Sequence, residues 1–364
     1  MNIFHNNRYK IQDCVNYCHE LDYLPTANAE IRTAAMNVPP MSALLSAACL
    51  AGTHLFLPQA AAQTEPFPAK PVRVVVGLPA GGGADVMARI IAASLGDGWH
   101  TQVIVENRVG AAGMMAAEAV AKSNPDGHTL LFGSVGTHAI LPNLYRNLPY
   151  NPARDFSEIS LAVTLPNVFL VHVPFPAKTL NEFIAHARAH PGTIKYASAG
   201  VGSTLHLSME MLRSRAGITL VHVPYKGGVQ AFPDLASGQI QAMFEILPTA
   251  LPNIQAGKVR ALAVTTAKRS LQLADVPTIA EAGMPGFEVT TWYALFAPAK
   301  TAPSTVARIS ADVAGAIAAP RVRERIAQLG AEAASSSPAQ LAAFVKAETA
   351  KWAKVITDAG IVAE

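Results

Sequence analysis

Residues 72–95 read VRVVVGLPAGGGADVMARIIAASL, and this stretch decides the fold class. A β-branched run at 72–76 leads into a glycine-rich turn, and apolar residues then recur at helical spacing. The apolar side of the predicted helix consists of Val86, Ile90, Ile91 and Leu95. A strand that passes through such a turn into a helix is the repeating unit of a parallel α/β sheet.

The same unit recurs towards the C-terminus. Further strands are predicted at 103–105, 129–132, 167–173, 194–197, 219–223, 240–244, 259–264 and 289–297. Further helices are predicted at 113–122, 180–190, 203–216, 277–283, 304–318, 320–329 and 338–359, and one opened by the loop at 224–228 ends at 235. The alternation predicts an α/β fold with mainly parallel strands and helices on both faces.

Composition limits the class of protein. The chain has 364 residues, enough for two or three domains. Hydrophobic residues make up 51% and charged residues 15%, which excludes a disordered chain. The net charge of +3 and the 7% aromatic content speak against a nucleic-acid partner. Cysteine occurs only at positions 14, 18 and 49, so the body of the chain has no thiolate for zinc or for catalysis.

The N-terminal segment 1–63 has the pattern of an extension followed by a secretory signal peptide. Residues 41–57 read MSALLSAACLAGTHLFL, an uncharged apolar run, and the small residues Ala60 to Ala62 follow. This pattern predicts cleavage between Ala62 and Gln63 and export to the periplasm. A membrane anchor or a lipoprotein at Cys49 remains an alternative, and the true start of translation is Met36 or Met41 if residues 1–35 are not translated.

Four glycine-rich loops carry the functional signal. They span 79–85, 133–138, 198–203 and 224–228, and each connects a predicted strand to a predicted helix. Backbone N–H groups in such loops, together with helix N-termini, can bind an anion without a cationic side chain. The alternative is ordinary turn chemistry, with Asp85 and Ser203 acting only as helix caps.

Catalytic motifs are weak in this sequence. It contains no Walker motif and no H-E-x-x-H motif, and Phe132 stands where a nucleophile elbow around Ser134 needs glycine. An α/β hydrolase that uses Ser134 or Ser203, with His138 or His206 as the base, remains the alternative from a different functional class.

An ordered series of motifs covers the chain from Pro68 to Ile361. It consists of PAGGGADVMAR (79–89), ENRVGAAG (106–113), PDGHTLL (125–131), LPY (148–150), DF (155–156), GVGSTLHL (200–207), PYKG (224–227), AGKVRALAV (256–264) and PTIAEAG (277–283). In this order the motifs resemble those of the Bug/TctC family, the extracytoplasmic solute-binding subunits of tripartite tricarboxylate transporters.

The resemblance implies a two-lobed type II periplasmic binding protein fold, in which each lobe is a mainly parallel sheet flanked by helices. Lobe one would comprise 64–165 plus 290–364, and lobe two 166–289, with hinges near Leu165 and Thr290. The two lobes would close on a small carboxylate ligand. The implied ligand-binding residues are Ala80, Gly81, Gly82, Asp85, Thr137, Gly200, Val201, Gly202, Ser203, Tyr225 and Glu245.

Two departures from the family pattern concern the distal part of the pocket. Glu245 stands where many members have aspartate, and Tyr293-Ala294 stands where an aromatic-glycine pair is usual. The resemblance implies no cofactor, metal or catalytic residue. It implies a monomeric carrier that delivers its ligand to membrane permease subunits; a receptor that signals rather than transports is the alternative.

Overall fold

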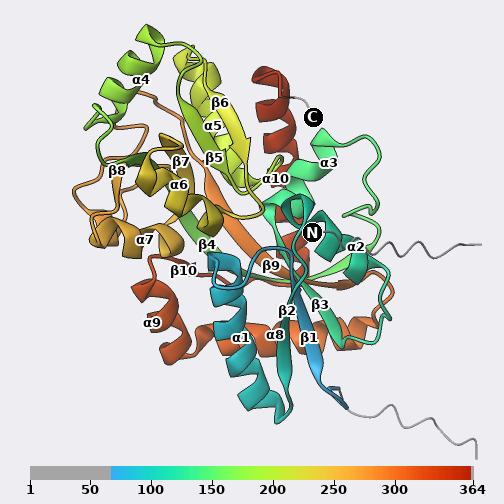
Figure 1. The fold of residues 1–364 in the computed structure, drawn as a ribbon. Helices are drawn as coiled ribbons and strands as arrows, with labels where there is room; N and C mark the ends of the chain where they lie inside the picture. The colour runs from blue at the N-terminus through green and yellow to red at the C-terminus, as the bar shows by residue number, and fades with distance from the viewer. Residues whose placement is uncertain (1–66, 362–364) are drawn as a thin grey trace, which may run out of the picture. The chain divides into compact units, whose positions relative to one another are not determined.

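The computed structural model describes residues 67–361, which form an α/β fold with a mixed sheet and flanking helices (Figure 1). The strands are β1 (Val72–Val76), β2 (Val103–Asn107), β3 (Thr129–Ser134), β4 (Phe156–His172), β5 (Lys195–Ser198), β6 (Val221–Pro224), β7 (Ala242–Ile246), β8 (Val259–Val264), β9 (Thr290–Pro298) and β10 (Glu332–Ala333). Hydrogen bonding runs in the order β2-β1-β3-β9-β4-β7-β5-β6, with β8 and β10 paired to β4.

Helices connect the strands and cover the sheet. The α-helices are α1 (Gly83–Trp99), α2 (Met114–Ala121), α3 (Leu141–Leu144), α4 (Leu180–Ala189), α5 (Thr204–Ala216), α6 (Phe232–Ser237), α7 (Leu247–Gln255), α8 (Pro303–Ala318), α9 (Pro320–Gln328) and α10 (Pro338–Asp358). Short helical turns are η1 (Ala111–Gly113), η2 (Gly136–Ile140), η3 (Gly228–Ala231) and η4 (Leu271–Leu273). Thr179 and Ser203 accept hydrogen bonds from the third residue of α4 and α5, as N-caps do.

The long strand β4 joins two sets of parallel strands. β1 pairs in parallel with β2 and β3, and β5 pairs in parallel with β6 and β7. The strands between these sets, β9 and β4, pair antiparallel with their neighbours. Parallel pairing therefore holds within each half of the fold, and the connection between the halves is antiparallel.

β4 changes partners in its middle. Residues up to Pro166 pair with β9, and residues from Asn167 onward pair with β7 and β8. Proline has no N–H to donate to a ladder, which suits the position where one pairing ends. The change lies beside the predicted hinges at Leu165 and Thr290. The lobe boundaries at 165/166 and 289/290 themselves stay a prediction.

A separate apolar cluster holds β7 and α7 in place. It includes Val168 of β4, Phe232 and Leu235 of α6, Met243 of β7 and Leu247 of α7, all buried. These residues fix the end of β7, where Glu245 lies.

The fold differs from the sequence-based expectation in several places. β4 begins at Phe156, well before the predicted start at 167. The prediction missed its first half, which mixes polar and apolar residues. The segment 277–283 forms turns rather than a helix; Thr278 makes a bridge to Val264, and Gly283 has φ +103°. Helix α7, with prolines at 248 and 252, was not predicted.

The predicted signal peptide and the three cysteines lie outside the described residues. Between 67 and 361, no helix combines the length and the apolar character that a membrane crossing requires. The same part of the chain holds no cluster of His, Cys, Asp and Glu side chains fit for a metal ion.

Candidate functional site

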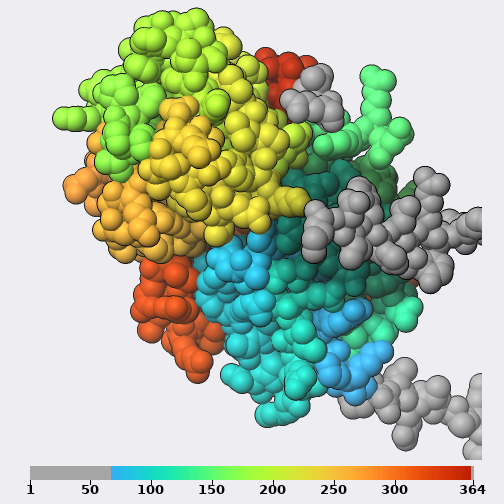
Figure 2. Space-filling view, in the orientation of Figure 1, coloured from blue at the N-terminus to red at the C-terminus, as the bar shows by residue number. Residues whose placement is uncertain are grey.

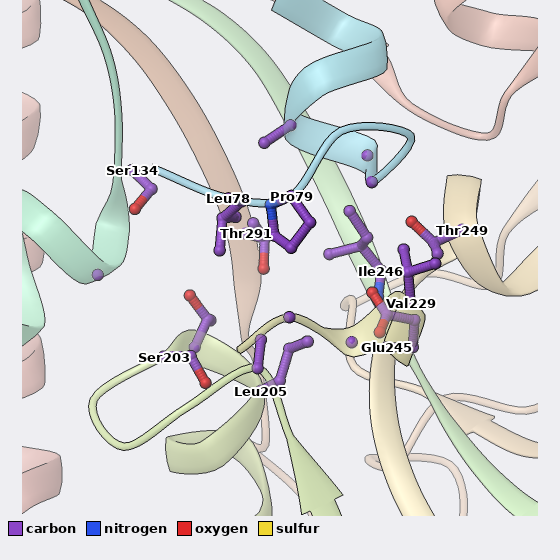
Figure 3. A pocket seen from close by; sticks show the side chains of 18 of the residues that line it. Leu78, Pro79, Ser134, Ser203, Leu205, Val229, Glu245, Ile246, Thr249 and Thr291 are labelled. Atoms are coloured by element: carbon purple, nitrogen blue, oxygen red, sulfur yellow. The ribbon is translucent and has the colours of Figure 1, made fainter. Parts of the chain in front are cut away.

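A small cavity of about 60 Å³ lies where strand ends and helix starts of both halves meet (Figure 3). Its lining residues are Leu78, Pro79, Gly82, Gly83, Ala84, Ala112, Ser134, Gly136, Ala199, Ser203, Thr204, Leu205, Gly227, Gly228, Val229, Glu245, Ile246, Thr249, Thr291 and Tyr293. In α/β folds, ligands bind at the carboxyl ends of parallel strands, and this cavity has that position.

A larger groove of about 610 Å³ lies near the crossing of β4 and β9. It is lined partly by the loop after β8 and by α10, with charged side chains such as Lys268, Arg269 and Glu288. It lacks the converging strand ends and helix starts that distinguish the small cavity, so the small cavity is the candidate binding site.

Glycines let the walls of the cavity approach each other closely. A Cβ on Gly227 would lie 2.6 Å from Cγ of Pro79, and a Cβ on Gly83 would lie 2.1 Å from Cδ1 of Ile246. In Figure 2 the blue surface of α1 and its preceding loop abuts the yellow surface of η3 and α6. The cavity is therefore covered by contacts between segments far apart in the sequence.

Three helices of eight residues or more begin at the cavity wall. Gly83 and Ala84 open α1, Thr204 and Leu205 open α5, and Thr249 lies in the first turn of α7. The N-caps of α1 and α7 have no side-chain cap, so their first N–H groups lack that partner. Three helix N-termini give the cavity a positive potential without a positive side chain.

The cavity has two polar ends. Figure 3 shows Ser134 and Ser203 at one side, and Glu245 and Thr249 at the other. Ser203 Oγ accepts from the backbone N–H of His206 at 3.2 Å, and Ser134 Oγ accepts from that of Thr137 at 3.4 Å. Each hydroxyl therefore still has its O–H available to donate a hydrogen bond to a ligand oxygen.

Glu245 dominates the second end. The residue is 3% exposed, and Oε1 accepts from the Ile246 N–H at 3.1 Å. Burial raises the pKa of Glu245 to about 8, although the Ile246 N–H opposes this effect. Oε2, like the hydroxyl of Thr249, is buried and has no hydrogen-bond partner among the described residues. Two unsatisfied polar atoms at one end of a cavity are a feature that a ligand can satisfy.

Tyr293 and Thr291 of β9 form the wall between the two ends. The Tyr293 ring stacks on Phe132 with centroids 5.3 Å apart, and burial together with the charge of Glu245 raises the pKa of its hydroxyl. Thr291 Oγ1 donates to Oδ1 of Asn167 at 2.7 Å. Among the described residues that line the cavity, none is lysine, arginine or histidine.

Three of the predicted ligand-binding residues line the cavity, namely Gly82, Ser203 and Glu245. Ala80 and Gly81 are exposed and lie outside the lining. The N–H of Gly81 donates to Asp85 Oδ2 at 2.9 Å, which also binds Arg89. Burial alone would raise the pKa of Asp85, but the bonds from Arg89, Gly81 and Asn107 lower it. Asp85 thus braces the loop from outside the cavity.

The other predicted residues also lie outside the lining. Thr137 Oγ1 bonds with Ser134 and with His138 Nδ1, at 2.8 Å from the latter. The hydroxyl of Tyr225 donates to Asp234. The ligand roles of Ala80, Gly81, Asp85, Thr137, Gly200, Val201, Gly202 and Tyr225 stay predictions.

The N–H groups of Gly200 and Gly202 are already hydrogen-bonded within the protein. Gly200 N–H donates to Ser198 Oγ at 3.1 Å, and Gly202 N–H donates to His206 Nδ1 at 3.4 Å. A Cβ on Gly202, which has φ +81°, would lie 2.6 Å from Leu141 Cδ2. Chain conformation and packing therefore both require glycine at position 202.

The rings of His138 and His206 are not placed as bases for Ser134 or Ser203. The backbone N–H of His206 donates to Ser203 Oγ, and its ring Nδ1 accepts from the N–H of Gly202. The His138 ring stacks on Phe296 with centroids 3.7 Å apart, and burial lowers its pKa to about 3. Neither ring bonds to the hydroxyl of Ser134 or Ser203 among the described interactions.

Sequence reasoning missed Thr249 and Thr291 as lining residues, and Asn167 behind them. Thr249 belongs to α7, a helix that the sequence did not predict. Thr291 lies near the start of the predicted strand 289–297, and no recognised motif surrounds it. The one available signal was Tyr293, since its departure from the family pattern indicated that β9 reaches the pocket.

A two-lobed α/β fold with a small covered cavity between strand ends, lined by helix starts and hydroxyls, defines a solute-binding protein of the type II periplasmic class. Residues 87–361 match the family model of the tripartite tricarboxylate transporter family receptor, TctC. The chain belongs to this family.

Several relatives are similar over most of their length. A UPF0065 protein from the tcbD-tcbE intergenic region of Pseudomonas sp. is 42% identical over 299 residues, covering 82% of this chain and 89% of that protein. Protein BugT of Bordetella pertussis is 35% identical over 295 residues, covering 81% and 90%.

Solved structures show the same fold. An R. palustris protein solved with adipate is 37% identical with a TM-score of 0.79, covering 81% of this chain and 99% of that one. MatC from Rhodopseudomonas palustris, solved with malate, is 36% identical with a TM-score of 0.76, covering 80% and 100%. The periplasmic binding protein BugD is 35% identical with a TM-score of 0.78, covering 82% and 100%.

Proposed function

We propose that this protein is a periplasmic receptor that captures a small carboxylate in the cavity and delivers it to the membrane permease of a tripartite tricarboxylate-type transporter. The observation that carries the proposal is the convergence of three helix N-termini and two hydroxyls on a cavity without cationic side chains. Such a site binds an anion through partial charges and hydrogen-bond donors. The adipate and malate in two relatives agree with this chemistry.

The carboxylate lies, in this proposal, at the end of the cavity formed by Ser134 and Ser203 (Figure 3). Both hydroxyls can donate there, and the start of α5 adds N–H groups of Thr204 and Leu205. The contacts of Gly227 with Pro79 and of Gly83 with Ile246 close the cavity over the ligand, and opening moves lobe two away from lobe one about the crossing at Pro166 and Thr290.

Export by the N-terminal signal, a monomeric state and the absence of catalysis complete the proposal. A carrier needs no nucleophile and base, and the described bonds of Ser134, Ser203, His138 and His206 provide no such pair. Transport rather than signalling is the role we favour, because the family match names a transporter receptor.

A thermal-shift screen of the mature protein against small mono-, di- and tricarboxylates tests the proposal. A ligand at 100 times its dissociation constant adds about 2.7 kcal/mol to the free energy of unfolding. We expect stabilisation by at least one carboxylate and none by matched uncharged amides. A panel without a stabilising carboxylate, or hydrolysis of an ester analogue by the protein, would contradict the proposal.

A further inference from the structure

The carboxyl group of Glu245 is built into the cavity wall with one oxygen unsatisfied. Oε1 accepts from the Ile246 N–H, whereas Oε2 is buried and has no partner among the described residues. Gly228 makes room for this oxygen, since a Cβ there would lie 1.5 Å from Oε2. A buried polar atom without a partner is unfavourable, and ligand binding is the means to satisfy it.

The surroundings of Glu245 contain little charge. The elements that form the cavity wall are the loop before α1, the start of α1, η1, the end of β3, η2, the loop after β5, the start of α5, η3, β7, α7 and β9. The titratable side chains that these described elements present to the cavity are Glu245 and Tyr293, and Tyr293 is kept neutral by burial. An ionised Glu245 would therefore stand beside a bound carboxylate with no cationic side chain between them.

The protonation state follows from burial. Removal from water disfavours the charged form and raises the pKa of Glu245 to about 8, with the Ile246 N–H as the opposing influence. Near pH 7 the group is mostly a neutral acid, which has one O–H to donate. Its free oxygen, Oε2, is the atom that can carry this proton into the cavity.

We propose that Glu245 binds a second carboxylate of the ligand as a neutral acid, its Oε2 hydroxyl donating to a carboxylate oxygen. This inference rests on the proposed function and narrows the ligand to a dicarboxylate. The first carboxylate lies at Ser134 and Ser203, and the second lies at Glu245 and Thr249 at the opposite end (Figure 3). The short O–H···O⁻ hydrogen bond that results is stronger than a bond between neutral groups.

The inference has a measurable pH dependence. The bound acid must stay protonated, so binding takes up one proton wherever free Glu245 is ionised. We expect the dissociation constant to be nearly constant below pH 7 and to rise about tenfold per pH unit above pH 8. Proton uptake on binding should approach one at pH 9.

Matched probes and calorimetry test the inference. The probes are adipate, hexanoate and 6-aminohexanoate, and the shorter series succinate, butyrate and 4-aminobutyrate, with malate added. We expect a dicarboxylate to bind at least tenfold more tightly than the monocarboxylate and the amino acid of its series. Titration of the unmodified protein in phosphate and in Tris at pH 8.5 gives the proton uptake without any variant.

Glu245→Gln supplies the second test, because the amide is a neutral donor at every pH. We expect this variant to bind the same dicarboxylate about three- to tenfold more weakly at pH 7, because an amide N–H is a weaker donor than a carboxylic O–H, and to lose the pH dependence. Glu281→Gln, at an exposed carboxylate paired with Arg269, is the matched control and should keep the pH dependence of the unmodified protein. Circular dichroism of both variants verifies folding.

Two sets of results are distinguishable. Tightest binding of an amino acid, or binding without proton uptake at pH 8.5, would overturn the role of Glu245 as a neutral acid while leaving the carboxylate receptor intact. Failure of every carboxylate to bind would overturn the proposed function, and this inference with it.

Discussion

Thr291 in the cavity wall donates a hydrogen bond of 2.7 Å to Oδ1 of Asn167, the residue at which β4 changes partners. Asn167 is completely buried. Its backbone exchanges hydrogen bonds with Thr265, and its Nδ2 lies 3.5 Å from Ser208 Oγ on α5. One side chain thus links the cavity wall, the crossing strands and the helix that begins at Ser203.

Asn167→Ala should lower the free energy of unfolding by about 1–3 kcal/mol, because it leaves the buried Thr291 hydroxyl without its acceptor. Urea denaturation followed by circular dichroism measures the change. Ser237→Ala removes an exposed hydrogen bond to Asp234 and serves as the control, with an expected effect within about 0.5 kcal/mol. Equal stability of Asn167→Ala and the unmodified protein would contradict the structural role given to Asn167.

Gly227→Val should weaken ligand binding about tenfold or more without unfolding the protein. Gly227 has φ 168°, an extended conformation that any residue adopts, so the effect comes from the collision of the new side chain with Pro79. Small-angle scattering should show a radius of gyration that decreases on ligand binding in the unmodified protein but not in the variant. Gly98→Ala, where a Cβ meets nothing within 4 Å, is the control. A variant that closes normally would argue against closure through this contact.

Ser203→Ala should cost about 1.5–3 kcal/mol of binding free energy if the hydroxyl donates to a carboxylate. It should also cost about 1 kcal/mol of stability, because Ser203 caps α5. Lys226→Met should change binding little, since Lys226 is exposed and outside the cavity lining. Calorimetry on the two variants compares them. Loss of binding in Lys226→Met with intact binding in Ser203→Ala would mean that an ion pair anchors the ligand.

Without ligand, Glu245 should make the protein less stable at alkaline pH. The pKa of Glu245 is raised by burial from 4.5 to about 8, so between these values the folded state binds a proton that the unfolded state has lost. Stability therefore falls as the pH rises through this window, by up to about 5 kcal/mol. Glu245→Gln should remove this part of the pH dependence in urea titrations at pH 5 and pH 8.5. If the difference in free energy of unfolding between Glu245→Gln and the unmodified protein is the same at pH 5 and pH 8.5, the pKa of Glu245 is not raised.

His138 should act in the opposite direction at acid pH. Burial lowers its pKa from 6.5 to about 3. Between these pH values the unfolded state binds a proton at His138 and the folded state does not. Stability is fully present above pH 6.5 and is lost as the pH falls towards 3, by up to about 5 kcal/mol. We expect His138→Gln to be less sensitive to pH between 6.5 and 4 in thermal unfolding scans. An unchanged pH profile would show that His138 titrates normally.

Local patterns predicted much of the fold. The cap at Ser203 and the strand Val259–Val264 follow from a hydrogen-bonding residue and a β-branched run that need no distant partner. The first half of β4 was missed because its partners β9 and β10 come much later in the chain. The segment 277–283 resembles a helix in its proline and glycine positions, but its bridge to Val264 decides its conformation.

The candidate site was predictable only in part. The resemblance placed Gly82, Ser203 and Glu245 among the binding residues, and all three line the cavity. It also placed Gly81 and Gly202 there, although their N–H groups already bond within the protein. Whether a loop N–H can bind a ligand depends on whether a neighbour such as Asp85 or His206 already accepts its hydrogen bond. A sequence motif does not specify the direction of an N–H group.

The order of strands has a consequence for how the chain becomes a folded protein. β3 has β1 on one side and β9 on the other, and β9 ends at Pro298, late in the sequence. A growing or truncated chain that lacks Pro298 therefore carries an uncovered edge on β3, ready to pair with any other extended segment. The sheet is completed only by contacts of long sequence separation, which slow folding. We expect C-terminal truncations before Pro298 to aggregate rather than to yield a folded N-terminal fragment.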